Sequence, residues 1–594
     1  MLPSRKLKLV VALCGCLCLQ PSTHLIAMSS PKLLTDPFLQ LPTEDSIRVV
    51  WFTEFAGTQH LVQFGANLER SVMATTTKLS KVREDQHSRV DQQVKNGQVY
   101  QKPQSRDIWR HEAIVSKLSS LAPSANNRIP YRVTSLRRNG DKVFSDRFTL
   151  APLPPKDSSL KILLTSDHQL KPMTPANLQK VTETVGQVDA VFFAGDLVNI
   201  PDRASEWFDD NRGNAFFPSL QGRANFTIDN ESGHTRYKGG AIIQSAPLFP
   251  TIGNHEVMGR FSLNSPLSDQ YGDAIPRRIA KDLYAQVTPK QTPHKNSTVD
   301  PTGLKNHSFN TDTYEEIFTL PAASPGGETY YAVTFGDVRL ISLYITRIWR
   351  TPRMDASAKG RYRERDEVLQ DPKQWGYGQH IFEPITVGSP QYEWLQSELN
   401  GSEFRKAKYK IVMFHHPPHS LGDNVVPAYT DPVPKIDFSD EGQIQSVRYE
   451  YPQAADYLMR DVMPLLESAG VQLVFYGHSH LWNRFQSPSG MHFLESSNVG
   501  NTYGAFTATN GEHRPIPSGF KEHYASVGNP NGLEPIVPNI NPLLDAQGHQ
   551  QPYITSNKIT VFSILDTNSG SISSYRFDTQ KPSSKAVKFD EFHL

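Results

Sequence analysis

An apolar run that ends in Gly-Asp decides how this chain folds: residues 190–199 read AVFFAGDLVN. A short apolar run of this kind is typical of a strand buried on both faces of a sheet. A helical pattern over residues 177–186 separates it from an equivalent run at 160–165, which is followed by the polar residues SDHQ at 166–169. Strand, helix and strand in this order predict an α/β core.

Three further apolar runs end in polar turns. Residues 253–256 read GNHE, residues 415–419 read HHPPH after the run 409–414, and residues 477–480 read GHSH after the run 471–476. Because open α/β sheets bind ligands at the carboxyl ends of their strands, we expect all five polar turns to converge. Carboxylate, imidazole and amide oxygen without thiolate suit divalent Mn, Fe or Zn. One Asp can bridge two such ions about 3.5–4 Å apart, the spacing of two-metal hydrolytic sites.

Each of these signals also has an ordinary structural explanation. A Gly-Asp pair usually forms a turn, a lone Asn or Gln commonly caps a helix, and adjacent histidines can simply lie in a loop. Five such turns in this order, all after apolar runs, indicate a functional site rather than coincidence.

The amino-terminal segment has the features of an export signal. Three basic residues among the first eight precede an apolar stretch at 9–19, which is too short to span a bilayer. All three cysteines of the chain lie between residues 14 and 18. Cleavage after Ala27 and a lipoprotein cut before Cys16 are the two interpretations, and a buried apolar segment is the structural alternative. We expect a secreted or periplasmic protein, with an acylated Cys16 as its single possible membrane anchor.

Charge and length limit the remaining function classes. The 594 residues include 61 Lys+Arg and 60 Asp+Glu, so there is no basic surplus for binding nucleic acid. The length exceeds that of one ordinary hydrophobic core and predicts two domains.

The domain pattern changes near residue 153. Residues 34–153 contain short β-branched and aromatic runs separated by turns, which predict a small β-sandwich. A proline-rich linker follows, and the α/β pattern extends over residues 158–580. With the signal peptide at 1–27, these are the three predicted parts. Long stretches at 258–325, 420–450 and 502–552 show little periodicity and are expected to be loops.

The five motifs resemble those of the calcineurin-like metallophosphoesterase superfamily, which read D-x-H, G-D, G-N-H-E/D, H and G-H-x-H. The chain looks most similar to the purple acid phosphatases, many of which carry an amino-terminal fibronectin-III-like sandwich. The resemblance implies an α/β fold with a four-layer core, a β-sandwich flanked by helices. It also implies an acid-phosphatase-like hydrolase of phosphomonoesters that uses two divalent metal ions. A phosphodiesterase or nucleotidase on the same site, or a non-catalytic metal-binding surface protein, are the alternatives.

Carried over motif by motif, the resemblance assigns Asp196 as the carboxylate that bridges both ions and His255 as the catalytic imidazole. Six further residues complete the two metal sites: Asp167, Gln169 and His480 in the first, and Asn254, His415 and His478 in the second. The family pattern V-x-x-H favours His415 over His416.

Two positions depart from the family pattern. Gln169 stands where D-x-H has a histidine ligand, so a weaker, neutral amide oxygen replaces an imidazole, and His168 is expected on the opposite face. Asn199 stands where purple acid phosphatases have the tyrosine that binds ferric iron, so the resemblance does not extend to a ferric ion. Candidates for phosphate contacts are Arg347, Arg350 and His419.

Overall fold

The computed structural model describes residues 33–91, 100–121, 128–231, 233–287, 300–348, 360–425, 428–507, 511, 513 and 533–594. The predicted export signal and Arg350 lie outside the described residues. Within the described part, no helix combines the length and hydrophobicity that a membrane span requires.

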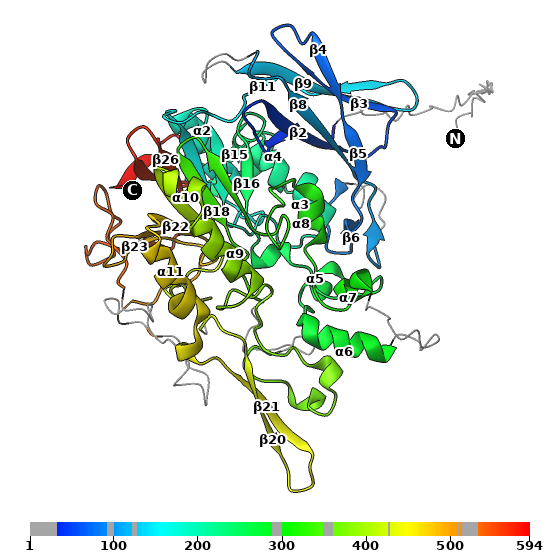
Figure 1. The fold of residues 1–594 in the computed structure, drawn as a ribbon, viewed down its shortest axis with the longest axis vertical. Coiled ribbons are helices and arrows are strands. Elements are labelled where there is room, and N and C mark those ends of the chain that lie inside the picture. Colours follow the sequence, from blue (N-terminus) through cyan, green and yellow to red (C-terminus); the bar gives the residue numbers. More distant parts are fainter. Residues whose placement is uncertain are drawn as a thin grey trace, which may run out of the picture.

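The amino-terminal region is all-β, as predicted, and is built mainly from two sheets (Figure 1). The first sheet has the order β1 (Phe38–Gln40), β2 (Ser46–Thr53), β8 (Trp109–Ser116) and β5 (Thr75–Lys78). The second has the order β10 (Lys142–Phe144), β9 (Ile129–Leu136), β3 (Gln59–Phe64) and β4 (Arg70–Met73), with β11 (Phe148–Leu150) also paired to β9. A two-stranded pair, β6 (Arg83–Glu84) and β7 (Gln104–Ser105), completes the region.

The two amino-terminal sheets share one apolar core. Trp51 of β2 lies in the same buried cluster as Val62 of β3 and Tyr131 of β9. The other face of β2 is buried as well, because the Phe52 ring lies 5.0 Å from that of Phe208 in the α/β part. The extent of residues 34–153 as a separate domain therefore stays a prediction.

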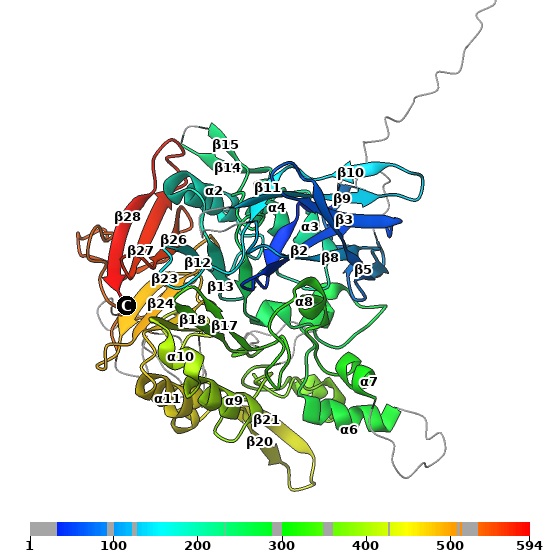
Figure 2. The ribbon, with the colours of Figure 1, turned by 45° about the horizontal axis from the view of Figure 1, so that its top comes forward.

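Two larger sheets form the α/β core (Figures 1 and 2). One has the order β16 (Leu248–Pro250), β13 (Ala190–Phe193), β12 (Lys161–Thr165), β26 (Ile559–Asp566), β27 (Ser571–Asp578) and β28 (Val587–His593). The other has the order β17 (Tyr331–Phe335), β18 (Val338–Ser342), β19 (Tyr409–Met413), β22 (Leu473–Tyr476), β24 (His492–Ser496), β23 (Trp482–Gln486) and β25 (Tyr553–Ile554). The strands that precede the polar turns pair in parallel within each sheet.

Neighbouring residues of a strand pack on opposite faces of its sheet and so belong to different layers of the core. Ile411 of β19 belongs to the large cluster that also contains Leu163 of the facing sheet. Its neighbour Val412 packs instead in a cluster with Leu395 of α9 (Pro390–Leu399) and Leu466 of α11 (Met463–Ser468). On the outer side of the first sheet, α2 (Thr174–Val185) contacts β26 and α4 (Phe216–Leu220), and α3 (Ala204–Phe208) contacts α4. This is the predicted four-layer arrangement of helices, sheet, sheet and helices.

Two of the stretches predicted as loops contain regular structure, so that prediction is wrong for them. Within 258–325 lie α5 (Leu267–Tyr271), α6 (Arg277–Val287), α7 (Pro301–Asn306) and α8 (Asp312–Ile317). Within 420–450, β20 (Val433–Phe438) and β21 (Ile444–Glu450) form a hairpin that projects from the body in Figure 1. Helices α5, α7 and α8 are too short for a periodic pattern, and all six residues of β20 are exposed, so these elements lack the periodicity used for prediction.

Shorter elements complete the described fold. They are the hairpin of β14 (Phe226–Asn230) and β15 (Gly233–Tyr237), helix α10 (Ser402–Lys406), and the π-helical turn η5 (Leu458–Val462) ahead of α11. Four 3-10 turns are η1 (Asn254–Glu256), η2 (Asp366–Val368), η3 (Pro372–Gln374) and η4 (Gln453–Ala455).

Candidate metal centre

The five polar turns meet at the carboxyl ends of the strands. The Asp167 N–H after β12 donates to the Gly195 carbonyl after β13 at 3.0 Å. The His255 N–H in η1 donates to the Asp196 carboxylate at 2.9 Å. The His478 N–H after β22 donates to the Asp167 carboxylate at 3.0 Å. Segments far apart in sequence thus hold one another in place around two buried carboxylates.

One group of side chains surrounds Asp167. The Nε2 atom of His480 lies 3.4 Å from Asp167 Oδ1, and Gln169 Nε2 lies 3.0 Å from Asp196 Oδ2. Gln169 Oε1 is buried and has no hydrogen-bond partner among the described residues. A buried amide oxygen without a donor is costly unless a cation or another donor reaches it.

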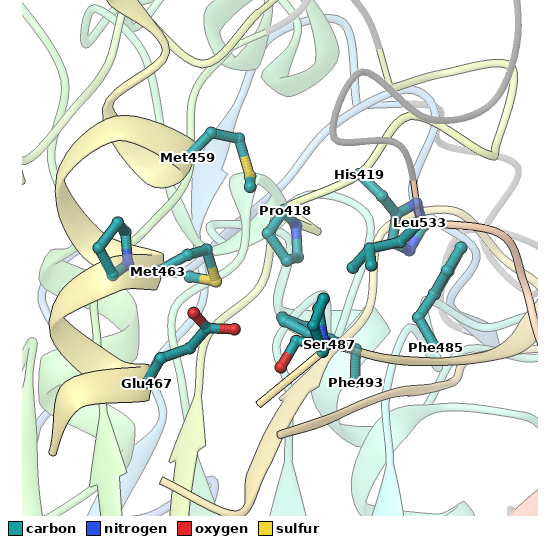
Figure 3. A pocket seen from close by; sticks show the side chains of 11 residues that line it. Pro418, His419, Met459, Met463, Glu467, Phe485, Ser487, Phe493 and Leu533 are labelled. Carbon is teal, nitrogen blue, oxygen red and sulfur yellow. The ribbon is translucent and has the colours of Figure 1, made fainter. Parts of the chain in front are cut away.

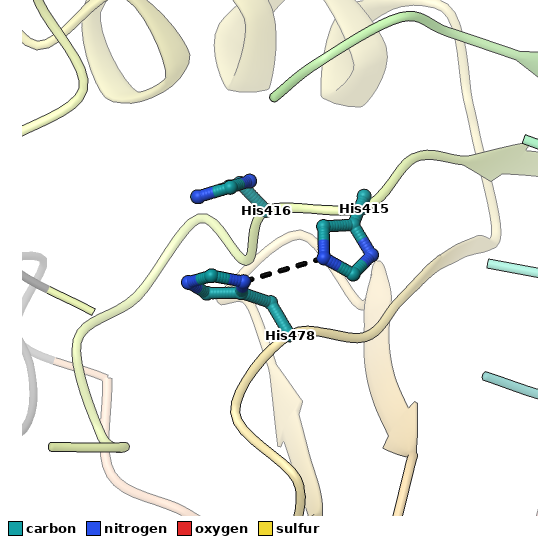
Figure 4. Close-up of side chains that lie close together, drawn as sticks. All are labelled: His415, His416 and His478. Carbon is teal, nitrogen blue, oxygen red and sulfur yellow. Dashed lines mark hydrogen bonds between the residues drawn. The ribbon is translucent and has the colours of Figure 1, made fainter. Parts of the chain in front are cut away.

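A second group surrounds His415. Its Nε2 atom lies 3.2 Å from Asp196 Oδ2, 3.2 Å from Asn254 Oδ1 and 3.3 Å from His478 Nδ1 (Figure 4). Asp167, Asp196 and His415 offer donor atoms that all lie within 4.8 Å of one another. Asp196 Oδ2 therefore faces both groups.

The adjacent His416 lies differently. Its Nδ1 is 2.9 Å from the Thr346 hydroxyl, and its ring stacks on that of His478 with centroids 3.8 Å apart (Figure 4). His416 is within reach of the same cluster, but the contacts with Asp196 and Asn254 belong to His415. The assignment of His415 rather than His416 as the metal ligand stays a prediction.

Backbone carbonyls orient three of the imidazoles. The Nδ1 atoms of His415, His480 and His255 lie 2.7–2.8 Å from the carbonyl oxygens of Ala194, Asn501 and Asn199, respectively. A carbonyl can only accept a hydrogen bond, so Nδ1 carries the proton in each ring. In each ring Nε2 is therefore the nitrogen that points into the site, which is the usual arrangement of a metal-binding histidine.

The backbone is strained at the same positions. Five of the twelve non-glycine residues with positive φ in the described chain are predicted ligands: Asp167, Gln169, Asp196, His478 and His480. This left-handed conformation costs about 1–3 kcal/mol per residue, and such strain is concentrated at functional sites. Gly253 and Gly477 allow the turns to approach, because a Cβ on either residue would collide with the Asp196 or Asp167 carboxylate.

The model of the calcineurin-like phosphoesterase family matches residues 160–481, more than half of the chain. The chain belongs to this family. It is therefore a phosphoric ester hydrolase, as the motifs predicted, with small phosphate esters as the implied substrates. The family and the buried His and Asp groups together indicate divalent metal binding.

Comparison with solved structures found several that are similar to this calcineurin-like phosphoesterase. A purple acid phosphatase from yellow lupin (Lupinus luteus) seeds matches 94% of this chain and 73% of that chain, with a TM-score of 0.50 and 14% identity. A structure of PhoD covers 94% of this chain and 92% of its own, with a TM-score of 0.40 and 11% identity. GAP50, the anchor in the inner membrane complex of Plasmodium, covers 73% and 89%, with a TM-score of 0.31 and 11% identity. No curated protein matches the sequence significantly.

The catalytic candidate of this phosphoesterase is the most open of the predicted site residues. The side chain of His255 is 21% exposed, and its Nε2 lies 4.0 Å from Asp196 Oδ2. Its ring stacks on that of Tyr271, with centroids 5.1 Å apart. His255 therefore lies beside the candidate metal groups without belonging to either.

Charge in the site favours a cation next to Asp196. Burial alone lowers the pKa of His415, but Asp196 and Asp167 outweigh it and raise that pKa to about 10. Burial likewise works to raise the pKa of Asp196, yet His415 and His255 hold it below its usual value. The negative charges of Asp167 and Asp196 would attract a metal ion in the same way.

Glu256 is a site residue that the motif analysis quoted without a role. Its carboxylate accepts hydrogen bonds from the backbone N–H groups of Asp196 (2.8 Å), Leu197 (2.7 Å) and Gly253 (2.7 Å). Burial, reinforced by the charge of Asp196, raises the pKa of Glu256 to about 8. It joins the turns after β13 and β16, so it positions Asp196 rather than facing a substrate.

His168, next to the departing position Gln169, and Asn199, the other departing position, face different ways. His168 packs its ring on Phe193 at 4.5 Å and lies in the core, opposite to Gln169, as expected. The Asn199 side chain donates to the Gln169 carbonyl at 2.8 Å. Asn199 therefore holds the turn at residues 166–169 in place through its side-chain amide, and its backbone carbonyl orients His255.

The described candidates for phosphate contacts have contacts outside the two metal groups. Arg347 donates to the Ala428 carbonyl and covers the Tyr429 ring. His419 lies 3.0 Å from the Tyr476 hydroxyl, and it lines an apolar pocket with Met459 and Met463 (Figure 3). The sequence did not single out Lys171, a buried cation two residues after Gln169.

Proposed function

We propose that this protein is a secreted phosphomonoesterase that acts with two divalent metal ions. The observation that carries the proposal is the position of Asp196 Oδ2, which lies between Gln169 Nε2 at 3.0 Å and His415 Nε2 at 3.2 Å. A bridging ligand requires one carboxylate oxygen that faces residues of both candidate metal groups, as Asp196 Oδ2 does here.

The donor set fits such a pair of ions. Asp167, Gln169 and His480 would hold one ion, and Asn254, His415 and His478 the other, with Asp196 shared. Oxygen and imidazole donors without sulfur suit Mn, Zn or ferrous iron. Two bound ions would orient the ester oxygens and activate a water molecule. His255, with Nδ1–H donated to Asn199, would present Nε2 to the leaving-group oxygen as the general acid.

A panel of esters assayed with Mn, Zn and ferrous iron tests the function. We expect the reconstituted protein to bind about two ions per chain and to hydrolyse 4-nitrophenyl phosphate faster than bis(4-nitrophenyl) phosphate. Preference for the diester or for nucleotides would replace the phosphomonoesterase with the corresponding alternative. Metal binding without hydrolysis of any ester would favour a non-catalytic surface protein.

Asn199 leads to a prediction about colour. Its neutral amide cannot supply a phenolate ligand, and it is already bonded to the Gln169 carbonyl. We expect a colourless protein that recovers activity with Mn or Zn after chelation. A visible absorption band that disappears on reduction would contradict this, and Tyr503 would then be its first candidate source because its ring lies 4.8 Å from His480.

The proposed location outside the cytoplasm depends on residues 1–27. The mass of the mature amino terminus distinguishes a start at Met28 from an acylated Cys16, and an intact Met1 in the cell-grown protein would contradict export.

A further inference from the structure

A buried glutamate holds the turn that carries two of the proposed metal ligands. Glu495 belongs to β24, which pairs in parallel with β22, the strand from which this turn emerges. Its Oε1 atom accepts hydrogen bonds from the Ser479 N–H at 2.8 Å and from the Ser497 hydroxyl at 2.6 Å. Ser479 stands between His478 and His480, so one carboxylate holds the backbone that links ligands of both candidate metal groups.

The backbone on both sides of Ser479 is strained. His478 and His480 have positive φ values of 79° and 56°. Such a conformation is costly for residues other than glycine and persists only where the surrounding structure fixes it. Ser497 contributes as well, because its hydroxyl accepts from the Leu481 N–H at 3.1 Å and its N–H donates to the Leu481 carbonyl at 3.3 Å. Hydrogen bonds thus fix the backbone at Ser479 and at Leu481, on either side of His480.

A chain of hydrogen bonds determines which atoms around Glu495 are donors. The Leu421 N–H donates to His419 Nδ1 at 3.1 Å, so His419 carries its proton on Nε2 and donates it to the Tyr476 hydroxyl at 3.0 Å. Tyr476 then donates its own proton to Asn483 Oδ1 at 3.0 Å. This leaves Asn483 Nδ2 to donate to Glu495 Oε2 at 2.6 Å. Both oxygens of Glu495 are therefore acceptors in a network of fixed direction.

The network lies in the protein interior. Tyr476, Ser479, Asn483 and Glu495 are all 0% exposed. A buried polar group that loses its hydrogen-bond partner is costly, because no water replaces the partner. Loss of one acceptor at Glu495 must therefore be compensated by movement of its neighbours, and the backbone at Ser479 is one of them.

We propose that Glu495, paired with Asn483, is a positioning residue that fixes the turn at residues 477–480 and thereby sets the affinity for both metal ions. This inference rests on the proposed function, because it uses the two ligand sets given there. His478 and His480 belong to different sets, so displacement of their shared turn affects both ions. Partners that orient metal ligands typically contribute about 10–100-fold to metal affinity.

The test first disrupts the pair. Glu495→Gln places an N–H₂ group opposite either Asn483 Nδ2 or the Ser479 N–H, so two donors face each other in both orientations of the new amide. Asn483 cannot invert its own amide in compensation, because Tyr476 donates to its oxygen. Asn483→Asp places a second carboxylate opposite Glu495. We expect each single variant to bind both ions about 10–100-fold more weakly, measured with Mn or Zn in competition with a chelator.

The double variant Glu495→Gln/Asn483→Asp exchanges the two groups and should recover both affinities. The introduced amide can donate to the introduced carboxylate, while the amide oxygen still accepts from the Ser479 N–H and the carboxylate from Tyr476. A general loosening of the core would not be reversed by a second substitution. Recovery therefore separates positioning of the turn from structural damage.

Glu364→Gln is the matched control. Glu364 is also buried, at 2% exposed, and its Oε1 atom also accepts from a backbone N–H and a hydroxyl, those of Gly376 and Tyr449, both at 2.7 Å. Its variant should bind both ions as the unsubstituted protein does.

Three results would each overturn the inference: unchanged affinities in Glu495→Gln, a double variant as weak as the single ones, or a Glu495→Gln chain that has lost its near-ultraviolet circular dichroism. If the unsubstituted protein bound two ions but hydrolysed no ester, the proposed function would fail, and the affinities alone would still decide the role of Glu495.

Discussion

Replacement of Asp196 by Asn is expected to abolish ester hydrolysis and to lower the metal content of the protein. The substitution keeps the size of the side chain but puts an N–H₂ group or a neutral oxygen between Gln169 Nε2 and His415 Nε2. Neither can bridge two cations as a carboxylate does. We expect kcat to fall by at least the roughly 10²–10³-fold that follows the loss of one preorganised stabilising group. Activity assays with elemental analysis of the purified variant measure both effects.

Asp189→Asn provides the control for this experiment. Asp189 directly precedes β13, at the opposite end of that strand from Asp196, and its carboxylate accepts from the Lys161 N–H at 2.8 Å. The same chemical change there should leave metal content and turnover unaltered. An Asp196→Asn protein with two ions and full activity would contradict the two-metal proposal.

His255→Ala is expected to lower kcat by about 10²–10⁴-fold, the usual contribution of a general acid. Metal content should survive, because the side chain lies outside both donor groups and its Nε2 is 4.0 Å from Asp196. A general acid matters most when the leaving oxygen is a poor leaving group. The loss should therefore be larger for an alkyl phosphate than for 4-nitrophenyl phosphate.

The control histidine is His307. Its Nδ1 also lies 2.8 Å from a backbone carbonyl, that of Gly303, and its ring also packs on a tyrosine, Tyr284, at 4.8 Å. His307→Ala should leave kcat unchanged for both esters. Loss of metal together with activity in His255→Ala would instead identify His255 as a ligand, and equal losses for both leaving groups would contradict its role as an acid.

The fold could be predicted from sequence where elements are buried and regular. The runs at 160–165, 190–194 and 471–476 became β12, β13 and β22 because strands buried on both faces carry continuous apolar side chains. The hairpin β20–β21 and the short helices α5–α8 were missed. Helices α5, α7 and α8 have only five or six residues and β20 is wholly exposed, so the amino-acid pattern along these elements records no constant inner face.

What the sequence by itself determined was the set of turns that form the site. Each motif lies directly after its own strand, so its chemistry is encoded locally and can be recognised in order along the chain. Only the tertiary structure decided how these side chains act together. The Nε2 orientation of three imidazoles and the clamp formed by Glu256 depend on contacts between segments far apart in sequence.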